Sequence, residues 1–530
     1  MAYRQKRLSG RVLACGVAAT LALAACSRAP AAHSGGSPVP AGLERFYDQK
    51  LHWVPCAPLV ALASGAAANA SEADEAVAGF QCTTVTVPLD YARPGGTTIK
   101  LAMNRLPATD KTGRIGALLT NPGGPGESGL AFAFGARSYF TARLRARYDI
   151  VGLDPRGVGL SSPVECKVTS QEQRETSAVA QAAALAQACE RTSGKILPYV
   201  GTDNAARDLD IARAALGDSK LDYYGASYGT LLGQVYAQMF PHNVGRMVLD
   251  SIDSPTGAGD PTAQAVSFET TFGVLIQSCI DRGRCPLGSS KNAALASFDN
   301  LLTRLRSAPL PLSKGRPPLT ASQVISFVEE NLYNEQDWPS VEATLGTLFR
   351  IPPAPAANGA SRGTPARVSA GVASSLGVAK TSELSGSFQA IECLTVPGDQ
   401  RTLSAAVRAG QEAQTVAPHF GPTIADQWLS CAKWPVPSPR TAGQAIRAAG
   451  TPTILLVNNS YDPATPLSWA TTVHGQLANS VLVTNTAGGH GFYRMGACTH
   501  GVVDSFLISG SKPAPGTACH DRNPALAPPA

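Results

Sequence analysis

The sequence lacks the residue spacings that commonly bind a metal ion. It has twelve cysteines and eight histidines but no paired C-x-x-C or H-x-x-x-H motif, the ligand spacings typical of zinc sites. Charge is also scarce, since charged residues make up 15% of the 530 residues and the formal net charge is +6. We therefore expect no bound metal ion and no nucleic-acid partner.

The apolar run near the N-terminus lacks the length to span a membrane. Residues 12–25 follow a cationic head and end in Leu23-Ala24-Ala25-Cys26, but a spanning helix needs about 20 residues. The pattern predicts a secretory signal at 1–25. Its end resembles the bacterial lipoprotein box, which implies lipidation of Cys26 and anchoring to the extracytoplasmic side of the cell membrane. An ordinary cleavage site before a cysteine is the alternative.

The predicted export changes the expected net charge of the mature protein and the expected state of its cysteines. Loss of residues 1–25 removes four positive and no negative charges, which lowers the net charge to +2. Residues 26–42 form an expected tether, rich in Ala, Gly, Ser and Pro. Ten cysteines follow Cys26, and an even count in an exported protein predicts five disulfides. Sequence cannot fix their connectivity, and our hypothesis is sequential pairing: Cys56–Cys82, Cys166–Cys189, Cys279–Cys285, Cys393–Cys431 and Cys498–Cys519.

Short apolar runs alternate with helical patterns over much of the chain. A helix is predicted at 204–216, ended by Gly217. This alternation indicates an α/β fold, with its body at 43–250 and 451–530. Between 251 and 450 the rhythm stops, which predicts an inserted, mainly helical cap containing a loop at 352–375. The candidate parallel strands are 115–120, 149–153, 221–224, 247–249, 453–457 and 481–483.

The segment Gly225-Ala226-Ser227-Tyr228-Gly229 carries the strongest chemical signal. It lies between a predicted strand and a helical run at 231–240, which is the context of the nucleophile elbow in the α/β-hydrolase fold. The flanking glycines allow the backbone to pack closely around a serine on a sharp turn. We therefore predict that Ser227 is the nucleophile of a serine hydrolase, a reaction that needs no cofactor.

A serine nucleophile needs a base and an acid, which follow it in the order Ser, acid, His in this fold. His490 lies in Gly488-Gly489-His490-Gly491 after a predicted strand, whereas the other histidines lie in helical patterns or beside cysteines. Asp462 follows the strand at 453–457 and is our choice of acid. Asp250, after the strand at 247–249, remains the alternative.

Acyl transfer also needs hydrogen-bond donors for the oxyanion. The amide of Tyr228, directly after the nucleophile, is the first predicted donor. The second is Gly124, in the turn Asn121-Pro122-Gly123-Gly124-Pro125-Gly126 after the strand at 115–120. A phosphate-binding loop is the alternative for this turn, but the turn lacks the G-K-[ST] ending of such loops.

Together these motifs resemble the prolyl iminopeptidase-type serine peptidases. They are the turn Gly123-Gly124-Pro125-Gly126, the later Leu153-Asp154-Pro155-Arg156-Gly157, the elbow, and the Asp462 and His490 loops. The chain is most similar to the exported tripeptidyl aminopeptidases of actinobacteria, including the mycobacterial lipoprotein proteases. The resemblance implies the α/β-hydrolase fold with a helical cap. It departs at Asn121-Pro122, where iminopeptidases carry a histidine, and this favours the tripeptidyl branch.

An aminopeptidase must also recognise a cationic α-amine, for which a desolvated carboxylate is the natural partner. Glu127 and Glu392 are the candidates, and Thr465 is a candidate for lining the substrate site. We thus predict release of short N-terminal peptides, which the resemblance implies are tripeptides, from peptides or proteins with a free N-terminus. The alternatives are a serine esterase or lipase, and a non-catalytic cell-surface lipoprotein.

Overall fold

The computed structural model describes residues 39–56, 77–175, 177–257, 260–312, 318–351 and 386–522. The predicted signal, Cys26, most of the tether and the predicted loop at 352–375 lie outside these ranges. In the described part of the chain, no helix has both the length and the apolar character needed to cross a membrane.

A mixed sheet of ten strands, in the order β1-β2-β3-β5-β4-β6-β7-β8-β9-β10, forms the centre of the described residues. Strands β1, β2 and β3 pair antiparallel at one edge, and β3 pairs antiparallel with β5. The strands from β5 to β10 along the sheet are parallel. The bounds are β1 Val54–Pro55, β2 Gln81–Pro88, β3 Thr98–Leu106, β4 Gly116–Asn121, β5 Tyr148–Leu153, β6 Leu221–Ser227, β7 Val244–Ile252, β8 Ile454–Tyr461, β9 Ser480–Gly488 and β10 Ala518–Cys519.

Each of the six predicted strands overlaps an observed one; β4 has the predicted length, shifted by one residue, and the other five observed strands are longer than predicted. β7 continues to Ile252, so Asp250 lies inside this strand. The sequence had predicted that Asp250 follows the strand. β8 continues to Tyr461, which places Asp462 directly after the strand. The antiparallel edge was not predicted. A two-residue strand such as β1 carries no periodic signal, but β2 and β3 have eight and nine residues and were missed as well.

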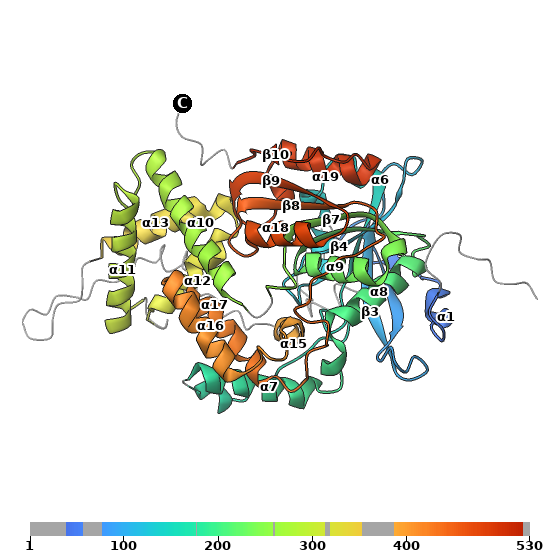
Figure 1. The fold of residues 1–530 in the computed structure, drawn as a ribbon, viewed down its shortest axis with the longest axis horizontal. Coiled ribbons are helices and arrows are strands. Elements are labelled where there is room, and N and C mark those ends of the chain that lie inside the picture. The colour runs from blue at the N-terminus through green and yellow to red at the C-terminus, as the bar shows by residue number, and fades with distance from the viewer. Residues whose placement is uncertain are drawn as a thin grey trace, which may run out of the picture. The chain divides into compact units, whose positions relative to one another are not determined.

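Helices cover both faces of the sheet, as expected for an α/β protein (Figure 1). One apolar core joins α8, α9 and α18 to the sheet, and a second joins α4, α6 and α19 to its other face. The predicted helix at 204–216 is α8. The bounds are α1 Glu44–Tyr47, α4 Gly129–Phe134, α5 Ala136–Tyr139, α6 Ala142–Arg147, α7 Ala178–Ser193, α8 Thr202–Ala215, α9 Tyr228–Met239, α18 Leu467–Gln476 and α19 Ala497–Ser509.

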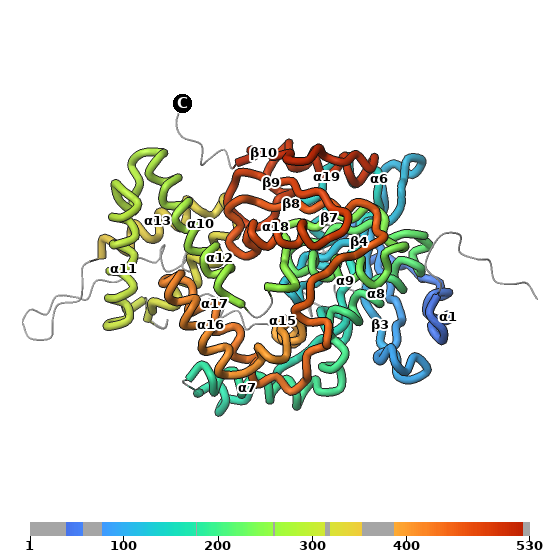
Figure 2. The backbone as a smooth tube through the Cα atoms, viewed as in Figure 1, coloured from blue at the N-terminus to red at the C-terminus, as the bar shows by residue number. Residues whose placement is uncertain are grey.

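The helices α10, α11, α12, α13, α16 and α17, inserted between β7 and β8, form the cap, and Figure 2 shows them grouped to one side of the sheet. They have an apolar core of their own. At the edge of this core, the ring of His419 lies between the carboxylates of Glu269 and Asp299, which connects α10, α11 and the residues that precede α17. The bounds are α10 Thr262–Asp281, α11 Lys291–Ser307, α12 Ala321–Leu332, α13 Trp338–Phe349, α16 Leu403–Val416 and α17 Gly421–Leu429.

Helix α15, Gly386–Thr395, is inserted with the cap but packs into the core of the body. Its buried residues Ile391, Cys393 and Leu394 join that core, as do Trp434 and Ile446 farther along the chain. The ten cysteines form five disulfides in the sequential pairing. Both cysteines of the Cys393–Cys431 bridge therefore lie in the core of the body, although the sequence pattern assigned this part of the chain to the cap.

Candidate active site

Ser227 lies at the junction of β6 and α9 in a strained backbone conformation, with φ 56° and ψ −130°. A non-glycine residue rarely adopts a positive φ, and such strain persists only where surrounding packing enforces it. The two elbow glycines allow this packing. A Cβ at Gly225 would lie 2.4 Å from the carbonyl oxygen of Gly229, and one at Gly229 would lie 2.7 Å from that of Asn121.

The glycine turn after β4 packs directly against the elbow. Gly123 has φ +101°, and a Cβ on it would lie 2.8 Å from the Cβ of Ser227 and 2.9 Å from the amide nitrogen of Tyr228. The side chain of Asn121 accepts a hydrogen bond from the Gly123 amide at 3.0 Å, which holds the turn. Gly124 and Tyr228 both line the cavity above Ser227. The two predicted oxyanion donors are thus on neighbouring segments.

Asp462 and His490 form a buried pair at the ends of β8 and β9. The Nδ1 atom of His490 lies 3.0 Å from both carboxylate oxygens of Asp462. Asp462 has no exposed surface, and its Oδ1 accepts the amides of Ala464 and Thr465. The hydroxyl of Thr465 donates to Oδ2 at 2.9 Å. Because Asp462 occupies the Nδ1 side of the ring, Nε2 is the nitrogen available to Ser227.

The surroundings of His490 combine burial with negative charge. Burial alone would lower the pKa of His490, but the charge and hydrogen bond of Asp462, with the charges of Asp250 and Glu127, raise it above its usual value. From the cap side, the ring of Tyr333 meets the imidazole edge-to-face, with centroids 5.3 Å apart. The amide of His490 also donates to the Tyr333 carbonyl at 2.8 Å. The cap therefore contributes directly to the position of His490.

Asp250, the alternative acid, has other partners. Its carboxylate accepts hydrogen bonds from the Tyr224 hydroxyl at 2.6 Å and from the amides of Phe492 and Tyr493 at 2.7 and 2.9 Å. These amides belong to the loop that follows His490. Asp250 thus supports the histidine loop, whereas Asp462 contacts the imidazole itself.

A cavity of about 500 Å³ lies over Ser227, between the body and cap helices α10, α12 and α17. Five carboxyl side chains line it, and none of the described residues lining it is Lys, Arg or His. Burial raises the pKa of Glu392 to about 8, and the charge of nearby Asp253 adds to this shift. The cavity is therefore suited to a cation. Its carboxyl residues are Asp253, Glu329, Glu330, Glu392 and Asp426.

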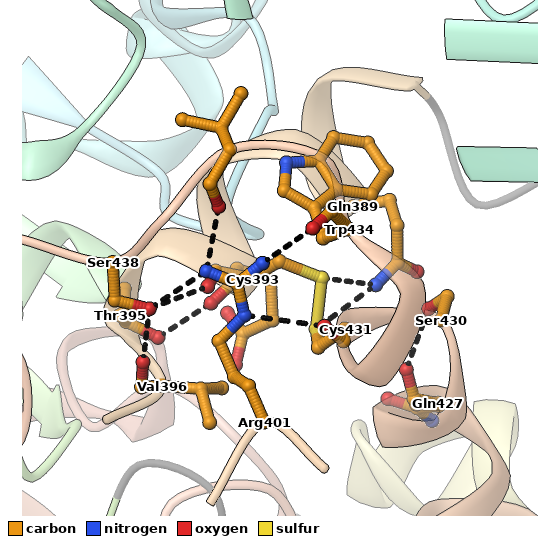
Figure 3. Close-up of a disulfide and its surroundings, with 12 residues drawn as sticks. Gln389, Cys393, Thr395, Val396, Arg401, Gln427, Ser430, Cys431, Trp434 and Ser438 are labelled. Atoms are coloured by element: carbon orange, nitrogen blue, oxygen red, sulfur yellow. Dashed lines mark hydrogen bonds between the residues drawn. A yellow bond between two sulfur atoms is a disulfide. The ribbon is translucent and has the colours of Figure 1, made fainter. Parts of the chain in front are cut away.

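The residues that follow Glu392 in the chain belong to a well-connected segment, and Figure 3 shows its contacts around Cys393 and Cys431. Cys393 is bridged to Cys431, and the Nε2 of Gln389 lies 3.0 Å from the sulfur of Cys393. Arg401 donates to the carbonyl oxygens of Cys431, Trp434 and Val436 and to the hydroxyl of Ser438. These contacts fix α15 against the body.

The structure separates the other predicted binding residues. Glu127 is exposed and is not among the residues lining the cavity, although its charge reaches His490. Thr465 lines the cavity and also donates to Asp462. Sequence reasoning missed Asp253, Glu329, Glu330 and Asp426. The sequence offered no local motif for them, since they come from three distant segments.

The fold, the strained serine and the paired Asp462 and His490 define a serine hydrolase of the α/β-hydrolase class. Residues 116–342 match the family model "alpha/beta hydrolase fold", and residues 417–519 match "TAP-like protein". The chain is 32% identical to the tripeptidyl aminopeptidase of Streptomyces coelicolor over 469 residues, 83% of each chain. It is 31% identical to the serine protease Hip1 of Mycobacterium tuberculosis over 507 residues, 89% of this chain and 91% of that protein.

A third relative, carboxylesterase B of Mycobacterium tuberculosis, is 30% identical over 465 residues, 83% of this chain and 86% of that protein. The chain belongs to the tripeptidyl aminopeptidase family of α/β-hydrolases and is a serine peptidase.

The packing of the glycine turn against the elbow yields a matched pair of substitutions. Gly123→Ala should abolish activity, because its Cβ would displace the elbow backbone beside Ser227. Gly217→Ala introduces the same positive-φ strain, worth about 1–2 kcal/mol, but nothing lies within 4 Å of its Cβ. It should lose stability and keep its activity. Hydrolysis rates and thermal unfolding of both variants test this, and equal activity in the two would contradict it.

Proposed function

We propose that this chain is an aminopeptidase that releases tripeptides from the free N-termini of peptides or proteins through an acyl-enzyme on Ser227. The observation that carries the proposal is the carboxyl-lined cavity over Ser227. A buried carboxylate is a costly group unless a cation pairs with it, and a peptide N-terminus supplies one. The names of the Streptomyces and mycobacterial relatives support the same reading.

In this mechanism Ser227 attacks the carbonyl carbon of the third peptide bond while Nε2 of His490 takes its proton. Asp462 holds Nδ1 of the ring and stabilises the imidazolium that forms. His490 then gives the proton to the leaving amine, and the C–N bond breaks to leave an acyl-enzyme. A water molecule, activated by the same histidine, hydrolyses the ester and restores Ser227.

Negative charge develops on the carbonyl oxygen during attack, and the amides of Tyr228 and Gly124 are the proposed donors to it. The Tyr228 amide belongs to the first turn of α9, where backbone N–H groups have no partner within the helix. The contact between Gly123 and the elbow keeps the second segment beside the first.

We assign the substrate amine to Glu392, with Asp253 beside it. Both line the cavity, and the raised pKa of Glu392 reflects the burial that makes pairing with a cation favourable. Glu127, the other sequence candidate, is not among the residues that line the cavity. An extended chain advances about 3.3 Å per residue, so a tripeptide needs roughly 10 Å between the amine anchor and Ser227.

A serine esterase is the second candidate, and one observation favours it, the similarity to a relative named carboxylesterase B. An ester substrate with a neutral acyl chain would leave the carboxyl groups of the cavity without partners, which argues against it. A non-catalytic surface protein would have no need for the pairing of Asp462 with His490.

The acid can be identified with a pair of isosteric variants. Asp462→Asn should lower kcat by about 10⁴-fold, because an amide favours the wrong imidazole tautomer. Asp250→Asn should keep most of the activity at temperatures where it stays folded, since Asp250 bonds the loop and not the ring. Ser227→Ala and His490→Ala serve as inactive references. Steady-state kinetics with thermal unfolding decide the case, and a crippled Asp250→Asn beside a near-silent Asp462→Asn would reverse our assignment.

The product length and the role of the amine can be tested together with decapeptides. Mass spectrometry should show N-terminal tripeptides from a free decapeptide and little cleavage of its N-acetylated form, because acetylation removes the charge that Glu392 binds. Glu392→Gln should lose this discrimination. Equal cleavage of both peptides, or cuts scattered along the chain, would leave a serine peptidase but eliminate the aminopeptidase.

We further propose that the protein is exported and held on the extracytoplasmic face of the cell membrane by lipid on Cys26. The support is the sequence Leu23-Ala24-Ala25-Cys26 after a cationic and apolar segment. Cells fed a clickable palmitate analogue should label the wild-type protein and retain it in the membrane fraction. Cys26→Ser should lose the label, whereas Cys15→Ser, within the signal, should keep it. Labelling of both variants alike would exclude Cys26 as the lipidation site.

A further inference from the structure

The cavity over Ser227 holds more carboxyl side chains than one substrate amine can pair with. Asp253 and Glu392 belong to the body, whereas Glu329, Glu330 and Asp426 come from cap helices α12 and α17. No ion pair connects any of these five with a cationic side chain in the described ranges. A peptide N-terminus bound at Glu392 would leave the cap group without a cation.

Glu329 is the cap residue that most needs a partner. Its Oε1 atom is buried from solvent and has no hydrogen-bond partner among the described residues. Burial raises the pKa of Glu329 to about 8, and the charge of Glu330 adds to the shift. An unpaired buried carboxyl oxygen is costly in a folded protein and commonly marks a site that a ligand completes.

Aromatic side chains beside this carboxyl fit a long cationic side chain. Phe268, Tyr333 and Trp428 line the same cavity. Lysine and arginine pack their aliphatic stems on apolar surfaces while the charged end reaches a polar partner, and aromatic faces also attract cations. A small cation would not use these rings.

We propose that Glu329, with the exposed carboxyls of Glu330 and Asp426 on the same cavity, forms a subsite for a lysine or arginine side chain within the three residues that the enzyme releases. This inference rests on the proposed tripeptidyl aminopeptidase function and adds its substrate preference. The body carboxyls bind the α-amine and the cap carboxyls bind the basic side chain, so one substrate supplies both cations.

The test uses tripeptide coumarylamides with a single lysine at each of the three positions in an alanine background. Norleucine counterparts keep the aliphatic stem and remove the charge. For at least one position, wild-type kcat/KM should favour lysine over norleucine by about tenfold or more, the size expected for a hydrogen bond between charged groups. Glu329→Gln should bring this ratio close to one and retain hydrolysis of the norleucine substrate.

Two further variants separate the subsite from the amine anchor. Glu392→Gln should lose the preference for free over N-acetylated substrates and keep the lysine preference. Glu412→Gln, which removes an exposed carboxylate from α16 outside the cavity, should behave as wild type. Circular dichroism and thermal unfolding confirm that each variant is folded.

The outcomes distinguish the proposal of a basic subsite from the proposal that the enzyme is an aminopeptidase. Equal rates for lysine and norleucine substrates in the wild type would overturn the basic subsite and leave the aminopeptidase intact. The same would follow if Glu329→Gln lost the free-amine preference, since Glu329 would then be the amine anchor. No hydrolysis of any free tripeptide substrate by the wild type would overturn both.

Discussion

Close contact between two glycine-rich turns holds the reactive serine in its strained conformation. Ser227 has a positive φ that a side chain normally avoids, and the turn after β4 lies against it with no room for a Cβ at Gly123. Because backbone packs on backbone here, the nucleophile and the proposed oxyanion donors are fixed relative to each other before substrate binds. Such preorganisation spares the enzyme a rearrangement during catalysis.

The parallel strands bring the rest of the site to the same edge. Ser227, Asp253, Asp462 and His490 each follow or end a strand among β6, β7, β8 and β9, and the carboxyl ends of parallel strands meet along one edge of a sheet. The length of β7 also explains why the two buried aspartates, Asp250 and Asp462, have different hydrogen-bond partners. Asp250 lies within the strand and bonds the loop after His490, while Asp462 lies beyond its strand and can reach the imidazole.

The sequence was most informative where a local pattern has one structural solution. The elbow around Ser227 requires a strand, a sharp turn and a helix, and all three are present, although α9 begins at Tyr228 and not at residue 231. The order of acid and histidine after the serine, with their positions after predicted strands, selected His490 and favoured Asp462 while leaving Asp250 as the alternative; the structure brings Asp462 and His490 into contact. Sequential pairing of the cysteines also agrees with the structure.

The cap carboxyls could not be found in the same way. Glu329 and Glu330 occur in an amphipathic helix, where adjacent charges indicate a solvated face, and Asp426 is about a hundred residues away on α17. Their meeting depends on helix packing within the cap core, which local periodicity does not specify. The position of α15 could not be predicted from the sequence either. Its neighbours in the sequence belong to the cap, whereas its neighbours in space belong to the body.

The division of the cavity between two cores has a consequence for substrate binding. Glu392 lies on a helix that packs into the core of the body, and Glu329 lies on a helix that packs into the core of the cap. A substrate that carries two cations therefore bridges the two cores, and each pairing relieves the cost of a desolvated carboxyl. The cap also carries Tyr333, which contacts His490 through its ring and its carbonyl. Binding at the cap and alignment of the catalytic base are thus physically connected through α12 and the residue that follows it.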